Sequence, residues 1–161
     1  MNRWFWALLA GAGMVVFGMY ATRKRIFISF DYDNDRRYRY LLSALKENAG
    51  SAIDFDDTTP DEIQSNDVGR IKAALLGKIK SATHTLVIVG DHANVRHRDS
   101  LAIGTRNWQW WEIERSKDEG KRLIAVKITP ASPSPDPLYS SRAKWALSFN
   151  VPAILKAIDE A

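Results

Sequence analysis

The sequence predicts an α/β fold in which helices cover both faces of a parallel sheet. Short apolar runs typical of buried strands occur at residues 26–30, 52–55, 85–89 and 123–128. Segments with apolar residues at helical spacing lie between these runs. Strands that alternate with helices form parallel sheets, because each helix returns the chain to the start of the next strand. Four strands are clear, and ligands of such folds bind at the carboxyl ends of the strands.

The helices are expected between these strands and at the end of the chain. Residues 36–48 carry leucines at helical spacing. A second helix follows the polar loop at residues 56–67, and a third ends at Glu119, after the long polar loop at residues 90–106. The proline-rich segment at residues 130–137 is expected to be irregular. The expected caps and stops are Gly50, Asn66 or Asp67, Thr105 or Asn107, and Gly120. The apolar face of the last helix, begun by Pro152, is expected to contain Val151, Ile154, Leu155 and Ile158.

The composition is that of a folded chain with about one domain. The 161 residues contain 23 Lys and Arg against 19 Asp and Glu, and the net charge of +4 is too small and scattered to predict nucleic-acid binding. Cysteine is absent, which excludes a disulfide framework, a thiolate zinc site and a cysteine nucleophile. Hydrophobic residues make up 45%, so the chain is not broadly disordered.

Residues 4–22 are predicted to form a membrane anchor. These 19 residues carry no charge, and as a helix they would extend roughly 28 Å, close to the hydrocarbon thickness of a bilayer. A cleaved signal peptide is the alternative, but the apolar run is longer than is usual for one. Arg23, Lys24 and Arg25 follow directly, which predicts a single-pass protein of the inner (cell) membrane with its globular part in the cytoplasm. The expected division is an anchor at residues 1–23 and one domain at residues 24–161.

Two groups of polar residues invite comparison with metal sites. Five residues near strand ends loosely resemble the magnesium site of phosphoacceptor receiver domains: Asp31, Asp33, Asp35, Asp91 and Lys127. The strand-end hydroxyl of that site is missing, so the acids are expected to be solvated residues that cap the next helix. His92 and His97 lie in a loop with no regular spacing that would fix zinc ligands. No metal site is predicted.

The segment WQWWE at residues 108–112 places a carboxylate beside large aromatic rings. Trp108, Glu112 and Arg115 share one helical face, because they stand at positions i, i+4 and i+7. A glutamate with apolar neighbours near the mouth of the sheet can have a raised pKa. From the residue pattern alone, a surface glutamate on a helix whose tryptophans pack into the core is the simpler interpretation.

Four segments, taken in order, resemble a Toll/interleukin-1 receptor (TIR) domain. They are RIFISF followed by DYD (residues 25–33), HTLVIVG (84–90), NWQWWEIE (107–114) and RLIAVKI (122–128). The third is similar to the helix in which a tryptophan precedes the family's essential glutamate by four residues. The resemblance covers residues 24–129 and is strongest to the bacterial TIR-like group that includes the sensor subunit of Thoeris phage-defence systems.

This resemblance implies a flavodoxin-like fold and, in the enzymatic members, cleavage of the nicotinamide–ribose bond of NAD. In some members cyclisation of ADP-ribose follows, and the product activates a downstream effector protein. By position Glu112 is then the catalytic residue, while Phe30, Asp31 and Trp108 bind the substrate. The resemblance also implies self-association of the domain and no cofactor, since NAD is the substrate. It assigns residues 57–67 to a loop that helps assembly and gates the pocket.

The residues leave a second function open. A TIR-like interaction module without catalysis could recruit partners at the membrane, since a fold does not determine a function. The glutamate four residues after Trp108 favours the enzyme, because an adaptor has no need of it. The long loop at residues 90–106, rich in Arg and His, departs from the family's pattern and is expected either to shape the pocket or to contact a ligand.

Overall fold

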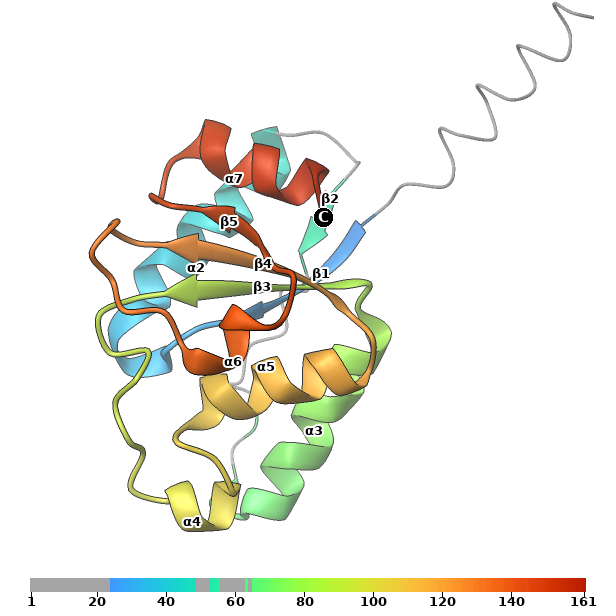
Figure 1. Ribbon diagram of the computed structural model, residues 1–161. Helices are drawn as coiled ribbons and strands as arrows, with labels where there is room; N and C mark the ends of the chain where they lie inside the picture. The colour runs from blue at the N-terminus through green and yellow to red at the C-terminus, as the bar shows by residue number, and fades with distance from the viewer. Residues whose placement is uncertain (1–23, 49–52, 56–62, 64) are drawn as a thin grey trace, which may run out of the picture.

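The computed structural model describes residues 24–48, 53–55, 63 and 65–161. In this part of the chain five parallel strands form one sheet in the order β2-β1-β3-β4-β5 (Figure 1). This is the flavodoxin-like order, in which the sequence order reverses between β1 and β3. The elements are β1 (Lys24–Ser29), α2 (Tyr32–Asn48), β2 (Ile53–Phe55), α3 (Val68–Ser81), β3 (His84–Val89), α4 (Ser100–Ile103), α5 (Trp108–Asp118), β4 (Arg122–Lys127), α6 (Asp136–Tyr139), β5 (Lys144–Ala146) and α7 (Val151–Asp159).

Helices cover both faces of the sheet, as the sequence predicts. Successive residues of β1 point to opposite faces, because side chains alternate along a strand. Ile28 packs with Leu42 of α2 and Ile154 of α7 on one face. Phe27 packs with Leu75 of α3 on the other face, where α5 also lies (Figure 1). The two cores are therefore separated by the sheet, and α5 lies on the same side as α3.

The four predicted strands are confirmed, with ends shifted by one or two residues. β1 begins at Lys24 and ends at Ser29, so Phe30 is the first residue beyond it. Helix α2 begins at Tyr32, four residues before the predicted start. The reason is a cap at Asp31, whose Oδ1 accepts hydrogen bonds from the backbone N–H of Asp33 at 3.0 Å and of Asn34 at 3.3 Å.

The predicted helix caps are confirmed where alternatives had been left open. Asp67 caps α3, since its Oδ1 accepts from the N–H of Gly69 at 2.8 Å and of Arg70 at 3.2 Å. Asn107 caps α5, since its Oδ1 accepts from the N–H of Trp110 at 2.9 Å. These caps fix where each helix starts relative to the sheet.

Three short elements were not predicted. α4 interrupts the loop at residues 90–106, and β5 adds a fifth strand of three residues. The expectation that residues 130–137 are irregular is wrong at their end, where α6 forms a single turn. Pro137 is accommodated there because the N–H groups of a first helical turn have no intrahelical acceptor. Val151 was expected on the apolar face of the last helix, but its exposure is 44%, because it lies in the first turn of α7.

The predicted anchor, residues 4–22, lies outside the described residues, and the division at residue 23 stays a prediction. Within residues 24–48, 53–55, 63 and 65–161, no helix is long and apolar enough to cross a membrane.

Candidate functional site

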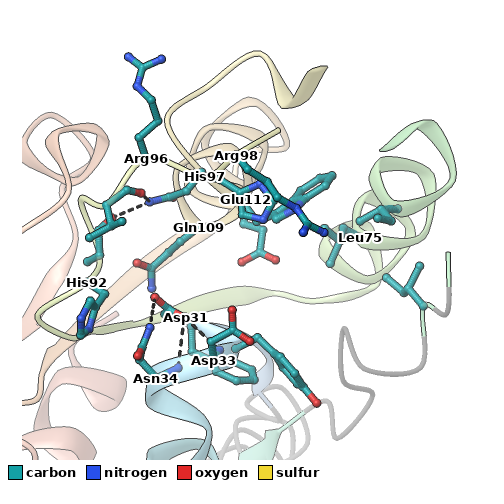
Figure 2. Close-up of a pocket in the computed structure, with 18 residues that line it drawn as sticks. Asp31, Asp33, Asn34, Leu75, His92, Arg96, His97, Arg98, Gln109 and Glu112 are labelled. Atoms are coloured by element: carbon teal, nitrogen blue, oxygen red, sulfur yellow. Dashed lines mark hydrogen bonds between the residues drawn. The ribbon is translucent and has the colours of Figure 1, made fainter. Parts of the chain in front are cut away.

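A pocket of about 590 Å³ opens where the carboxyl ends of β1 and β3 meet the amino end of α5 (Figure 2). This is the edge at which the sequence predicts ligand binding. All four predicted site residues line it. The lining consists of Phe30, Asp31, Tyr32, Asp33, Asn34, Ile63, Ile71, Leu75, His92, Ala93, Val95, Arg96, His97, Arg98, Asn107, Trp108, Gln109 and Glu112.

Glu112 lies on the second turn of α5 and is 3% exposed. The Ser29 hydroxyl donates a hydrogen bond to Glu112 Oε2 at 2.5 Å. Burial raises the pKa of Glu112 to about 8, while the Ser29 hydrogen bond and the charge of Lys78 act in the opposite direction. The simpler interpretation, a surface glutamate, is therefore wrong.

Polar side chains occur on a face of the sheet that is otherwise apolar. Ser29 is fully buried at the end of β1, after the apolar residues Ile26, Phe27 and Ile28. Thr85 and Ser116 are also fully buried, and their hydroxyls are 2.8 Å apart. Buried hydroxyls need hydrogen-bond partners. The pairs Ser29–Glu112 and Thr85–Ser116 therefore hold α5 in a fixed register against the sheet.

Gln109 is a site residue that the sequence analysis missed. It precedes Glu112 by three residues, so both side chains project from one face of α5. Gln109 is 4% exposed, and its Nε2 donates to the carbonyl of Ile88 at 2.7 Å. A second, longer contact joins Nε2 to the carbonyl of Ser29 at 3.5 Å. The spacing of three was the available signal, but the tryptophans around Gln109 suggested a purely structural helix.

The predicted substrate-binding residues lie in the pocket with different surroundings. Trp108 begins α5 and meets Trp111 edge to face, with ring centroids 6.2 Å apart. Phe30 lines the pocket but also belongs to the core beneath α2 and α7. Both carboxylate oxygens of Asp31 accept hydrogen bonds from the first turn of α2, Oδ2 from the Asn34 side-chain amide at 3.0 Å. Asp31 is thus a helix cap in the pocket wall.

The loop at residues 90–106 shapes the pocket, one of its two predicted roles. Asn107 Nδ2 donates to the carbonyls of Ala93 at 3.0 Å and Val95 at 2.9 Å. Trp110 Nε1 donates to the Asn94 side chain at 3.1 Å. These bonds join the loop to the first turn of α5, the helix that carries Glu112. The wall and the carboxyl group are therefore positioned by the same element.

Four basic or titratable side chains of this loop line the pocket. His92 and His97 do so with Arg96 and Arg98. In Figure 2, Arg98 extends toward Leu75, whereas Arg96 extends away from the other labelled side chains. His97 Nδ1 accepts from the N–H of Asp99 at 3.0 Å. Within the described residues, no group of three or more His, Cys, Asp or Glu is arranged to hold a metal ion.

The expectation that the acids after β1 are solvated is wrong for Asp35. This residue is 5% exposed, and burial is the main cause that raises its pKa to about 6. A Cβ built on Gly90 would lie 2.2 Å from Asp35 Oδ2, so the carboxyl group packs directly against the Gly90 backbone. Lys127 does not complete a receiver-like site through its amino group, which donates to the carbonyl of Pro130 at 3.3 Å.

Comparisons with solved structures identify similar folds. The chain is similar to a prokaryotic SEFIR domain, with 18% identity and a TM-score of 0.50 over 85% of this chain and 88% of that chain. It also matches the TIR domains in the structure of the activated Roq1 resistosome recognizing the pathogen effector XopQ. That match has 16% identity and a TM-score of 0.42 over 86% of this chain and 85% of that chain. The SEFIR similarity supports the fold alone, and the Roq1 similarity is too low to support an argument.

A comparison with curated proteins found no match. A family model described as "Thoeris protein ThsB, TIR-like domain" matches residues 27–132. These residues include the last three residues of β1, all of β2, β3 and β4, the loop at residues 90–106 and all of α5. Because the match covers more than half of the 161 residues, this chain belongs to the Thoeris ThsB TIR-like domain family.

Proposed function

We propose that this TIR-like defence module cleaves the nicotinamide–ribose bond of NAD, with Glu112 as the catalytic residue. The observation that carries the proposal is a glutamate, 3% exposed, in the wall of a pocket of about 590 Å³. Its carboxyl group accepts a hydrogen bond from the neutral hydroxyl of Ser29. A buried acid of this kind lowers the stability of the folded state, and such groups are concentrated at functional sites.

The reaction breaks the bond between C1′ of the ribose and the ring nitrogen of nicotinamide. The electron pair leaves with nicotinamide, which becomes neutral, and a positive charge develops on the ribose. Ionised Glu112 accepts hydrogen bonds from the ribose hydroxyls and stabilises that charge. Addition of water to C1′, with release of a proton, gives ADP-ribose. Addition of an adenine nitrogen in place of water gives a cyclic product.

The raised pKa of Glu112 links its ionisation to substrate binding. The pKa of about 8 applies to a carboxyl group that no positive ligand faces. The nicotinamide ring of NAD carries a positive charge, and a nearby opposite charge favours the ionised carboxylate. Binding of NAD therefore lowers the pKa of Glu112 and releases its proton, so that Glu112 is ionised when the substrate is bound.

The rest of the pocket fits a dinucleotide in size and charge. Its volume lies in the range of ordinary small-molecule sites. Trp108 offers a ring for stacking against a base, and Leu75 adds apolar wall. Arg96 and Arg98 of the loop also line the pocket, and a guanidinium group can bind a diphosphate.

The test is a comparison of two glutamates on the same helix. Glu112→Gln keeps the size of the side chain and removes its charge, and we expect NAD cleavage to fall by at least about a hundredfold. Glu114→Gln is the matched control, because Glu114 is partly exposed and does not line the pocket. Mass spectrometry of the nucleotides after incubation with NAD measures the NAD cleavage of both full-chain variants. Near-normal turnover by Glu112→Gln would contradict the assignment. If wild-type protein, even crowded on a membrane, leaves NAD intact, the adaptor function replaces the enzyme.

The proposal extends to the setting of the domain. We propose that residues 4–22 anchor it in the inner membrane with the pocket in the cytoplasm, on the basis of the uncharged run and the basic cluster after it. Confinement in a membrane raises the local concentration of the domain, which favours self-association. The product of NAD cleavage would then act on a downstream effector protein.

A further inference from the structure

We infer that Gln109 binds the carboxamide of nicotinamide, and that its Oε1 accepts a hydrogen bond from the carboxamide N–H. This inference rests on the proposed function and deepens it, because it assigns the group that recognises the leaving half of the substrate. In the view of Figure 2, Gln109 lies between His92 and Glu112.

The orientation of the Gln109 amide is set by its surroundings. Nε2 lies 2.7 Å from the carbonyl oxygen of Ile88 and 3.5 Å from that of Ser29. A carbonyl oxygen can only accept a hydrogen bond, so the amide nitrogen must occupy this position. The amide oxygen is therefore directed away from the strand carbonyls.

Gln109 Oε1 is a buried acceptor with no donor. It has no hydrogen-bond partner among the residues that the structure describes. The side chain is 4% exposed and lines the pocket. Burial of a polar atom without a partner is unfavourable, and each such atom calls for an explanation. A ligand that brings a donor into the pocket supplies one.

The position of this acceptor relative to Glu112 identifies the donor. Gln109 and Glu112 are three residues apart on one helical face. Both contact Ser29: Gln109 contacts the Ser29 carbonyl oxygen, and Glu112 contacts the Ser29 hydroxyl. Glu112 is assigned to the ribose hydroxyls at the reacting carbon. The nicotinamide carboxamide is the neutral donor attached to the other side of the same bond. Gln109 is thus placed to bind it while Glu112 faces the ribose.

The experiment compares two dinucleotides that differ only in this group. Nicotinic acid adenine dinucleotide carries a carboxylate, an acceptor, in place of the carboxamide. Full-chain wild-type protein is expected to cleave NAD with the higher kcat/KM, because a site built to accept an N–H disfavours an analogue that lacks it. Gln109→Met removes the amide at similar length and should reduce this preference by about tenfold or more, mainly through the KM for NAD. The control Glu114→Gln should keep the wild-type preference.

Each result decides the inference. Equal kcat/KM for the two dinucleotides in wild-type protein overturns it, whether or not the variant folds. An equal loss of both activities in Gln109→Met, with the preference unchanged, means a structural role and also overturns it. A third result also overturns it. If Gln109→Met loses only the preference for NAD over 2′-deoxyribose NAD, the donor that Gln109 binds is a ribose hydroxyl and not the carboxamide.

A binding measurement separates this inference from the proposed function. If wild-type protein cleaves neither dinucleotide, the proposed reaction fails, and thermal shifts with nicotinamide and with nicotinic acid still test Gln109. A larger shift with nicotinamide that disappears in Gln109→Met supports the inference. Equal shifts with the two compounds, or a difference that survives the substitution, overturns it.

Discussion

Glu112 lowers the stability of the fold that contains it. Its pKa is about 8 in the folded protein against an ordinary value of 4.5, so between these two values the folded chain holds a proton that the unfolded chain has released. The free energy of unfolding therefore falls as pH rises through this window. Functional sites commonly contain a buried group that lowers the free energy of unfolding of the protein.

Glu112→Gln should consequently stabilise the protein, and by more at high pH. The amide has no ionisation to suppress, and its oxygen can still accept from Ser29. We expect little gain at about pH 4, a gain of more than about 2 kcal/mol at about pH 8, and a constant difference above about pH 9. Thermal or urea unfolding across this range measures it, with Glu114→Gln as a variant whose difference from wild type stays independent of pH. A constant difference for Glu112→Gln would mean that the group is ionised when folded.

A glycine is needed at position 90 because the Asp35 side chain leaves no room for a Cβ atom, and not because of the backbone conformation. A Cβ at this position would lie 2.2 Å from Oδ2 and 2.7 Å from Cγ of the buried Asp35. Gly90→Ala should therefore lower stability by about 1–3 kcal/mol in urea unfolding. Gly77→Ala is the matched control, since a Cβ there meets nothing within 4 Å inside α3, and it should stabilise by up to about 1 kcal/mol. A Gly90→Ala cost that persists unchanged with Asp35→Ala would refute this contact as its cause.

At this scale, spacing explains what could be predicted. The pairing of Trp108 with Glu112 could be predicted from the sequence, because a separation of four residues places two side chains on one helical face. The contact of Glu112 with Ser29 could not be predicted from the sequence, because the two residues are 83 positions apart and meet only through the packing of α5 on β1. The burial of Asp35 was hidden for the same reason, since its carboxyl group packs against Gly90, which is distant in the sequence.

Helix α5 and the loop before it act as one element. Asn107 caps the helix through Oδ1 and holds the loop through Nδ2, which donates to the carbonyls of Ala93 and Val95. Asn107→Asp separates these roles, because aspartate is an equally good cap but has no N–H to donate.

We expect Asn107→Asp to loosen the loop while α5 keeps its helical content. The amide of His97, which donates to the Arg106 carbonyl at 2.8 Å, should exchange with deuterium faster than in wild type, while the amides of α5 should exchange at nearly the wild-type rate. Hydrogen-exchange mass spectrometry of both segments measures this. Unchanged exchange in the loop would show that the two donated bonds do not hold it.

Element lengths explain the rest of the prediction. β1, β3 and β4 were predictable because each is a continuous apolar run in a sheet buried on both faces. β5 has three residues and α4 and α6 have four each, which is too short for a period of 2.0 or 3.6 to become visible. These elements depend on packing against the sheet and not on local sequence preference.

The proposed anchor predicts one orientation of the whole molecule in the membrane. Digestion of intact spheroplasts with an external protease should leave residues 24–161 uncut, whereas digestion after lysis should degrade them, because the basic cluster at residues 23–25 favours the cytoplasmic side. Immunoblotting of the globular part measures this, with a periplasmic protein as the control for protease access. Degradation from outside would contradict the orientation.

The common direction of the five strands determines which way the pocket would face. If residues 4–22 form the proposed anchor, the starting edge of every strand would be the edge nearest the bilayer, because all five strands run in the same direction as β1, which begins at Lys24. β1 and β3 have six residues each and separate that edge from the pocket by about 20 Å. The sheet would act as a spacer, and the pocket would open toward the cytosol, beyond the lipid headgroups. Copies anchored in one bilayer would then hold their pockets at the same height, so that neighbours meet flank to flank and NAD enters each from the side opposite the lipid.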